Sequence, residues 1–389
     1  MKARIKPDVG FSPRFCVFLI VFTLVLGACA TTPALATPAK TPSTTTFDQQ
    51  LQTQLTAKMK EMRVPGAVIF VQSARTGSWT TSLGTSDLAT NAPMNPSLHF
   101  RIGSITKTFT GTVILQLVDE GKLRLDDPIA RYEPQVPNGA HITIRELLNM
   151  RSGLYNYSED PGFEQTLSNH PNTVWTPQEL VAIGFKHPAY FAPGKDFHYS
   201  NTNTILLGMV IEHITGHTAV SEFQRRIFTP LGMNNTSMPP QTSSAMPVPY
   251  SQGYMLNTPA KQGAAQQLLN VTTWNPSWTW TAGGAISTLH DLQIWSKALA
   301  TGKLLKPATQ KERLTWDTKL PGDIGYGLAI ANYAGFIGHN GQLPGYQSFM
   351  SYMQAKDETI IILTNLYAAP DGSEPADSLA KIIIKDLSS

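Results

Sequence analysis

Apolar and polar residues follow different periods along the chain, and these patterns predict where helices and strands lie. Segment 47–64, FDQQLQTQLTAKMKEMRV, predicts a helix that ends near Pro65. Runs 66–74 and 78–84 are rich in β-branched and aromatic residues, and the RTG between them is typical of a hairpin turn. This part of the chain is therefore expected to form one helix followed by two paired strands.

Helical patterns then dominate the middle of the chain, and apolar strands return near its end. Four helices that stop at glycine are expected at 104–120, 143–153, 203–216 and 288–302. Pro, Gly and Trp dominate 239–281, which predicts long ordered loops. Four β-rich runs follow at 326–333, 336–341, 346–353 and 359–365. A last helix is expected at 377–386.

This order of elements predicts a two-lobed α+β architecture. The portions at about 47–125 and 283–389 would share one antiparallel sheet flanked by helices. A mainly helical lobe, at about 126–282, would be inserted between them. Pockets commonly lie between such lobes, so we expect the functional site in that crevice.

The first 28 residues differ in character from the rest of the 389-residue chain. Four basic residues there precede an apolar run of about 14 residues, which is shorter than the roughly 20 needed to span a membrane. Residues 1–28 therefore predict a signal peptide. LGAC at 26–29 resembles a bacterial lipobox, which predicts lipidation of Cys29. A plain cleavage site at ALA, 34–36, and an uncleaved anchor are the alternatives.

All three alternatives place the domain outside the cytoplasm. Residues 30–46 consist almost wholly of Ala, Thr and Pro, which is typical of an extended tether. We expect a lipoprotein held at the outer side of the cytoplasmic membrane through its lipid anchor. A secreted or periplasmic protein is the alternative.

Charge and cysteine content narrow the possible functions of the domain. Residues 1–28 carry the chain's whole net charge of +3, so no nucleic-acid partner is expected for the neutral remainder. The only cysteines, Cys16 and Cys29, lie in the leader or at its edge, which excludes disulfides and thiolate chemistry from the domain. His213 and His217 lack the glutamate of a zincin motif, and no metal site is expected.

Ser104 and Lys107 lie three residues apart on a segment that predicts a helix. This spacing places both side chains on one face, where an amine can take the proton of a serine hydroxyl. The lysine must then have a pKa lowered from about 10.4 towards about 7–8. The alternative is a helix with a polar seam, because four threonines crowd the same turns: Thr106, Thr108, Thr110 and Thr112.

Further motifs follow in a fixed order along the chain. They are FRIGSITKTFTG (100–111), KLRLDDPI (122–129), LLNMRSGL (147–154), FAPGKDFHYSNTNTILLGMVIEHITG (191–216), PLGM (230–233), AGGAISTLHDL (282–292) and GHNG (338–341). With them, the chain from about residue 51 onward resembles the serine penicillin-binding proteins and β-lactamases, in the branch of class C β-lactamases and low-molecular-weight DD-peptidases. The resemblance implies the β-lactamase/DD-peptidase-like fold, acyl-enzyme chemistry and no cofactor.

The resemblance also assigns roles to residues far from Ser104 in the sequence. Tyr199 and Asn201 match the family's Tyr-x-Asn motif. Tyr199 would be ionised or share its proton with Lys107, and would relay the Ser104 proton to the leaving group. Asn201 would bind the substrate's acyl amide, although it could also simply cap the following helix.

The third family motif, His-x-Gly on a strand, is matched by His339 and Gly341. His339 would adjust the proton affinities of the catalytic pair, and Gly341 would let the substrate backbone approach. By the same match, the backbone N–H groups of Ser104 and Gln342 would form the oxyanion hole.

The chain departs from related carboxypeptidases beside that glycine. Asn340 and Gln342 stand where those enzymes carry hydroxyl residues, and YGLAIANYAG, 326–335, contains no arginine for a terminal carboxylate. Among TWNPSWTW, the tryptophans Trp274, Trp278 and Trp280 are expected to fill loop core, with one as a candidate for the pocket wall.

The sequence therefore predicts a cell-envelope serine hydrolase acting on a small-molecule or peptide acyl donor. A D-alanyl-D-alanine carboxypeptidase-like activity on peptidoglycan-type amides ranks first. A carboxylesterase or weak β-lactamase of the same family is the alternative, and a non-catalytic envelope binding protein is a rival from another class.

Overall fold

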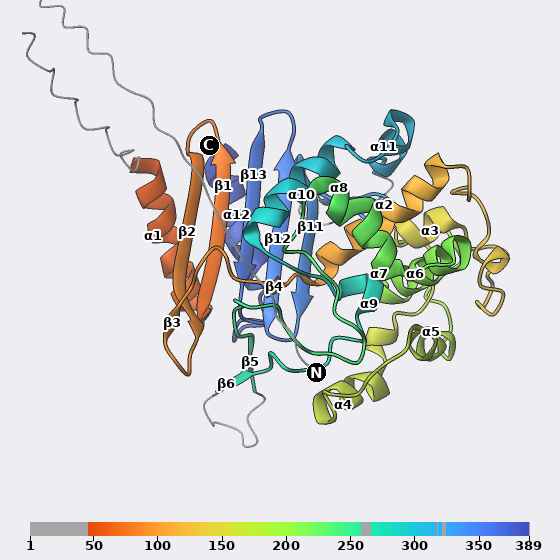
Figure 1. Cartoon of the computed structure of the whole chain (residues 1–389), viewed down its shortest axis with the longest axis horizontal. Helices are drawn as coiled ribbons and strands as arrows, with labels where there is room; N and C mark the ends of the chain where they lie inside the picture. The colour runs from red at the N-terminus through yellow and green to blue at the C-terminus, as the bar shows by residue number, and fades with distance from the viewer. Residues whose placement is uncertain (1–45, 258–265, 317, 321–323, 389) are drawn as a thin grey trace, which may run out of the picture. The chain divides into compact units, whose positions relative to one another are not determined.

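A nine-stranded antiparallel sheet joins the two ends of the folded chain in the computed structural model (Figure 1). The structure describes residues 46–257, 266–316, 318–320 and 324–388. The sheet order is β3-β2-β1-β13-β12-β11-β10-β9-β8. Its strands are β1 (Gly66–Ser73), β2 (Gly77–Asp87), β3 (Ala92–Pro93), β8 (Thr318–Leu320), β9 (Ile324–Tyr326), β10 (Ala331–Tyr333), β11 (Phe336–Leu343), β12 (Tyr346–Met353) and β13 (Glu358–Thr364).

The central strands of this sheet are buried on both faces, so successive side chains pack alternately in two separate cores. On β1, Val68 packs in one core and its neighbour Ile69 in the other. The core that contains Ile69 is covered by α1 (Thr46–Glu61) and α12 (Pro375–Ser388), both of which contribute buried leucines to it. The core that contains Val68 is continuous with the helical part of the chain.

Helices from the middle of the chain cover the second face and gather beyond β11, as Figure 1 shows in colours that run from orange through green to blue. They are α2 (Thr106–Asp119), α3 (Ile144–Leu148), α4 (Pro161–Asn169), α5 (Pro177–Phe185), α6 (Asn201–Thr215), α7 (Ala219–Phe223), α8 (Thr229–Leu231), α9 (Trp280–Gly283), α10 (Leu289–Thr301) and α11 (Pro307–Arg313). Two short strand pairs lie outside the main sheet: β4 (Phe100–Arg101) with β7 (Ile286–Ser287), and β5 (Tyr254–Leu256) with β6 (Leu268–Asn270). The predicted α+β fold, a large antiparallel sheet flanked by helices, is confirmed.

Some element boundaries differ from those predicted. The run 326–333 is not one strand, because a turn at Ala329, with φ of 54°, separates β9 from β10. The helix predicted at 143–153 shortens to α3, because Met150 adopts a positive φ of 63°. The predicted loop region 239–281 also contains β5, β6 and the start of α9.

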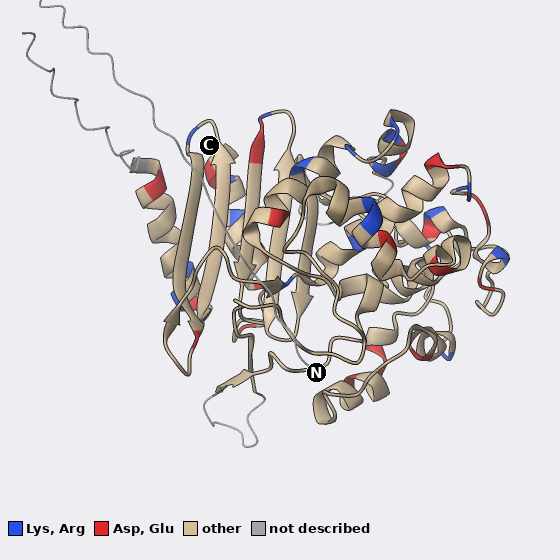
Figure 2. Cartoon of the chain, viewed as in Figure 1, with Lys and Arg blue, Asp and Glu red and all other residues tan. Residues whose placement is uncertain are grey.

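The predicted leader, Cys29 and the tether lie outside the described residues. Within the described ranges, no helix has both the length and the apolar character needed to cross a membrane. The described residues form one compact unit, and the lobe boundaries inside it remain predictions. Figure 2 shows basic and acidic residues interspersed over the helices and loops rather than gathered in one block.

Candidate active site

Ser104 lies in a tight turn between β4 and α2. Its residues, Gly103–Ile105, form a 3₁₀ turn that runs directly into α2 at Thr106, so the predicted helix begins with a tighter first turn. Gly103 has a φ of 52°, and a Cβ there would lie 2.6 Å from the Gln342 nitrogen. Only glycine tolerates both that φ and that approach, so this residue lets the turn pack against β11.

The threonines of α2 are buried, and every one of their hydroxyl groups is hydrogen-bonded. Thr106, Thr108 and Thr112 donate to backbone carbonyls of their own turn at 2.6–2.7 Å, and Thr110 donates to the Thr281 carbonyl at 2.8 Å. Thr108 and Thr112 also accept from the buried Trp295 and Arg313 side chains at 2.8 Å. The polar seam therefore exists, but it anchors the helix inside the protein rather than facing solvent.

Lys107 is fully buried beneath Ser104. Its Nζ lies 3.0 Å from the Ser104 Oγ, 2.7 Å from the Asn201 Oδ1 and 2.8 Å from the Ala282 carbonyl oxygen. Within the described part of the chain, no carboxylate forms an ion pair with it. Burial without a counter-charge lowers the pKa of Lys107 well below its usual value.

The hydrogen bonds around Lys107 suit a base. A neutral amine has two N–H donors and one lone pair. The Asn201 and Ala282 oxygens take the two donors, which leaves the lone pair for the Ser104 hydroxyl. When the amine gains the serine proton, each of its three N–H groups already has an acceptor, so the charged form is also satisfied.

Tyr199 precedes α6 and lies on one side of Ser104. The Lys107 Nζ is 4.8 Å from the centroid of its ring. Burial of its hydroxyl raises the pKa of Tyr199 above the usual value, and a hydrogen bond with Ser104 opposes this only partly. Tyr199 is therefore a protonated phenol suited to donate a proton. Of the two expected states, the ionised tyrosine was wrong, and a proton shared with Lys107 stays a prediction.

Asn201 is the first residue of α6, and Ser200 is the N-cap, so Asn201 does not cap this helix. Its Oδ1 accepts from Lys107 at 2.7 Å, and its Nδ2 donates to the Ser158 Oγ at 2.9 Å. Its backbone N–H donates to the Asn156 Oδ1 at 3.0 Å. These bonds fix the amide between the lysine and the cleft, where it lines the wall.

His339 was expected to adjust the proton affinities of the catalytic pair and to belong to the substrate-binding residues; its ring centroid lies 6.1 Å from that of Tyr199. The side chain is 2% exposed and does not line the cavity around Ser104. Its Nδ1 is 2.6 Å from the Asn340 carbonyl oxygen, so that nitrogen carries the proton, and Nε2 accepts from Tyr326 at 3.1 Å. Burial lowers the pKa of His339 to about 3, so a neutral imidazole lies on the face of β11 that Gly341 shares, toward Tyr199 and the nucleophile turn.

Gly341 brings β11 against the nucleophile turn. A Cβ there would lie 2.1 Å from the Ile102 carbonyl oxygen and 2.9 Å from the Ser104 nitrogen. The missing side chain thus accommodates the protein's own backbone, not only a substrate. Gln342 pairs with Gln347 across the hairpin of β11 and β12, next to the closing pair Leu343–Tyr346. At this place in an antiparallel ladder the Gln342 N–H points away from β12. The Ser104 and Gln342 N–H groups are therefore close together at the cleft.

Ser104 opens into a cavity of about 480 Å³ between β11 and the helices. Its wall includes Tyr199, Asn201, Gly341 and Gln342, as predicted. Sequence reasoning missed six other lining residues: Ser158, Phe163, Glu164, Leu167, Tyr367 and Glu374. Trp278, one of the tryptophans considered for this role, also lines it, whereas Trp280 is buried.

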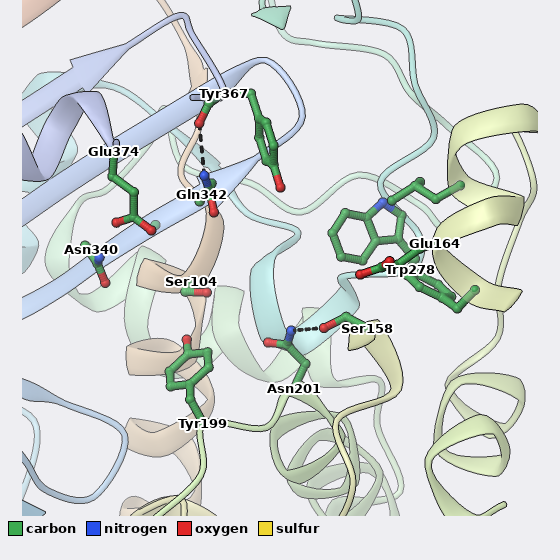
Figure 3. A pocket seen from close by; sticks show the side chains of 13 residues that line it. Ser104, Ser158, Glu164, Tyr199, Asn201, Trp278, Asn340, Gln342, Tyr367 and Glu374 are labelled. Atoms are coloured by element: carbon green, nitrogen blue, oxygen red, sulfur yellow. Dashed lines mark hydrogen bonds between the residues drawn. The ribbon is translucent and has the colours of Figure 1, made fainter. Parts of the chain in front are cut away.

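The two carboxylates of this cavity lie on opposite sides of Ser104 (Figure 3). Glu164, from α4, lies near Trp278 on the Asn201 side. Glu374, just before α12, lies near Asn340. Among the residues described, no group of three His, Cys, Asp or Glu side chains is arranged to hold a metal ion.

Comparisons with known proteins agree with this geometry. The Beta-lactamase family model matches residues 51–382. The protein flp of Staphylococcus aureus (strain MRSA252) is 25% identical over 332 residues, which cover 82% of this chain. The chain spans only 63% of the length of that relative.

Solved structures give closer likenesses. A D-stereospecific amidohydrolase from Streptomyces sp. has a TM-score of 0.75 and 34% identity, covering 87% of this chain and 97% of its own. The D-amino acid amidase of Ochrobactrum anthropi SV3, complexed with D-phenylalanine, has a TM-score of 0.73 and 28% identity, covering 87% and 98%. A penicillin-binding protein homologue from Pyrococcus abyssi has a TM-score of 0.74 and 26% identity, covering 87% and 77%. The chain therefore belongs to the Beta-lactamase family, among serine hydrolases that include amidases and penicillin-binding-protein homologues.

Proposed function

We propose that this protein is a cell-envelope serine hydrolase that cleaves amides of D-amino acids through an acyl-enzyme. The observation that carries the proposal is the buried Lys107 amine, 3.0 Å from the Ser104 hydroxyl and without a carboxylate partner in the described structure. A lysine in that setting is a base, and a base beside a serine at the floor of a cleft is the arrangement that nucleophilic catalysis requires.

Acylation begins when the Ser104 Oγ attacks the substrate carbonyl and its proton passes to the Lys107 Nζ. The oxyanion accepts hydrogen bonds from the Ser104 and Gln342 N–H groups. As the C–N bond breaks, Tyr199 gives its hydroxyl proton to the leaving nitrogen and regains a proton from the Lys107 ammonium. The amine departs, and the acyl group remains on Ser104 as an ester.

Deacylation repeats these steps with water as the nucleophile. The water oxygen attacks the ester carbonyl while one water proton passes to Lys107. The Ser104 Oγ–C bond then breaks, and the serine oxygen takes that proton back. The products are an amine and a carboxylic acid, and Ser104 and Lys107 return to their starting forms.

The charges of the cleft favour an amide with a free amine over a peptide with a terminal carboxylate. The only charged side chains on the cavity wall within the described residues are Glu164 and Glu374, and no arginine lines it. A carboxylate substrate would be repelled there, whereas an ammonium group would be attracted. The D-amino acid amidase and the D-stereospecific amidohydrolase support the same choice. We therefore rank this activity above the D-alanyl-D-alanine carboxypeptidase and the esterase.

Labelling and turnover test the proposal together. A fluorophosphonate probe should label the wild-type protein and not Ser104→Ala, since the probe reacts with an activated serine. D-phenylalanine amide should be cleaved faster than both its N-acetyl derivative and D-Ala-D-Ala. Absence of labelling at Ser104 would favour the non-catalytic alternative, and hydrolysis of p-nitrophenyl esters alone would favour the esterase.

The envelope location is part of the proposal and rests on the lipobox-like LGAC at 26–29. Radiolabelled palmitate should be incorporated into the full chain expressed in a bacterium and lost in Cys29→Ala. Incorporation that persists in this variant would contradict lipidation at Cys29.

A further inference from the structure

We propose that Glu374, supported by Asp377, forms the leaving-group subsite and selects amines that carry a second, positively charged group while rejecting those that end in a carboxylate. The inference rests on the proposed amide hydrolysis and adds to it the chemical class of the group released. It assigns the two carboxylates of the cleft to different halves of the substrate.

The position of Tyr199 identifies the leaving-group side. In the proposed mechanism Tyr199 protonates the departing nitrogen, so this nitrogen and its substituent lie on the Tyr199 side of Ser104. Figure 3 shows Glu374 and Asn340 on one side of Ser104, and Glu164 with Trp278 on the opposite side, beyond Asn201. The charge of Glu374 also reaches the Tyr199 hydroxyl, where it raises the pKa. Glu374 therefore faces the leaving group, and Glu164 faces the acyl group.

Asp377 holds the Glu374 end of the cleft in place. Its Oδ2 accepts from the Asn340 Nδ2 at 2.8 Å, which ties the start of α12 to β11. Tyr333 donates to the other side of the same amide, at the Asn340 Oδ1, over 3.3 Å. Asn340 is one residue from Gly341, so the start of α12 and the nucleophile turn both contact the same strand, β11.

Glu374 and Asp377 also interact directly. Burial raises the pKa of Asp377 to about 7, and the charge of Glu374 and a hydrogen bond from it add to the effect. The Asn340 amide and Lys381 oppose this rise. Asp377 therefore loses its proton as the pH rises through about 7, and the negative charge at this end of the cleft increases. A cation that enters this end of the cleft meets that charge, and a carboxylate meets repulsion.

Three amides of D-alanine test the proposal, because they share one acyl group and have leaving amines of similar size. Their leaving groups are 2-aminoethylamine, propylamine and glycine, which are cationic, neutral and anionic. We expect kcat/KM for the cationic amine to exceed that for propylamine by about tenfold, equivalent to about 1.4 kcal/mol, and glycine to be the poorest. The preference should shrink at high salt and increase between pH 6 and pH 8 as Asp377 loses its proton.

Two substitutions at one position make the test decisive. In Glu374→Gln the cationic-to-neutral ratio should fall to about threefold or less, and in Glu374→Lys the order of cationic and anionic amines should reverse. Glu164→Gln is the matched control. It should leave the cationic-to-neutral and cationic-to-anionic ratios of kcat/KM unchanged, since Glu164 lies on the acyl side. A ratio unaffected by Glu374→Gln and Glu374→Lys would overturn the proposal.

The same substrates separate this inference from the proposed function. N-acetylation removes the acyl-side ammonium and leaves the leaving groups unchanged. If the N-acetyl amides are preferred, the acyl-side assignment fails, and the leaving-group ratio is then read on the N-acetyl series. A Glu374-dependent ratio in either series supports the subsite, and a Glu374-independent one contradicts it.

Discussion

The centre of the cleft disfavours charged side chains, whereas its two ends expose carboxylates to a ligand. At the centre, Lys107 and His339 are buried with their hydrogen bonds satisfied, and burial lowers the pKa of both. At the ends, Glu164 and Glu374 line the wall and remain open to a ligand. In the proposed function the two regions have separate tasks: the buried Lys107 takes up and returns protons, and the carboxylates at the ends select the substrate.

The largest effect should follow from changing the base. Lys107→Met removes the amine that takes the Ser104 proton, and we expect kcat/KM to fall by about 10³-fold or more. Lys107→Arg should be equally inactive, because a guanidinium stays protonated. Lys195→Met, at an exposed lysine, is the control and should keep wild-type activity. Activity retained in Lys107→Met would show that the centre does not depend on this base.

A smaller loss is expected where β11 contacts the nucleophile turn. In Gly341→Ala the new Cβ would lie 2.1 Å from the Ile102 carbonyl oxygen, so the strand and the turn must move apart. The Ser104 and Gln342 amides then lose their alignment, and kcat should fall by about 10²-fold. Gly162→Ala, where the nearest atom is 3.1 Å away on Asp160, serves as the control. Unchanged kcat in a folded Gly341→Ala would argue against an oxyanion hole at this contact.

The neutral state of His339 predicts a pH dependence of stability. Its pKa is lowered from 6.5 to about 3. Above pH 6.5 the folded and unfolded states are both neutral; between pH 6.5 and about 3 only the unfolded state takes the proton, so stability is lost as pH falls. The free energy of unfolding should drop by about 2 kcal/mol more between pH 7 and pH 5 in the wild type than in His339→Gln. Urea unfolding measures this, and equal drops would mean that His339 takes up its proton as readily in the folded as in the unfolded state.

The smallest expected effect concerns the acyl end. Glu164→Gln removes the charge that faces the substrate's own amine, and the preference for D-phenylalanine amide over its N-acetyl derivative should fall by about fivefold, a typical change for one partly exposed charge. Competition between the two substrates in one reaction gives this ratio directly. A preference that stays at its wild-type value would move amine recognition away from Glu164.

The sequence was sufficient to predict the centre of the site. Ser104, Lys107, Tyr199, Asn201 and Gln342 come together as their motifs indicated, because those motifs fix both the residue type and the local backbone. The alternation of β11 could also have indicated the place of His339, since side chains two apart on a strand share a face. Gly341 faces the nucleophile turn, and so His339 faces away from Asn340 and Gln342.

The ends of the cleft could not be predicted in the same way. Glu164 and Glu374 belong to no spaced motif, and their approach to Ser104 depends on how α4 and the start of α12 pack. One local signal was available: Asp160 caps α4 through a 2.7 Å bond to the Phe163 N–H, and Pro161 occupies the first turn. This pattern predicts the helix, but not the direction in which its glutamate points.

The protonation state of Lys107 is the most direct test of how the centre works. In protein labelled with ¹³C-lysine, the Cε resonance of Lys107, assigned by its loss in Lys107→Met, reports whether the amine is charged at each pH. We predict a midpoint well below the ordinary value of 10.5, with the amine at least partly neutral at the pH of maximal activity. A Lys107 that stays fully charged up to pH 10 would contradict its role as the base for Ser104.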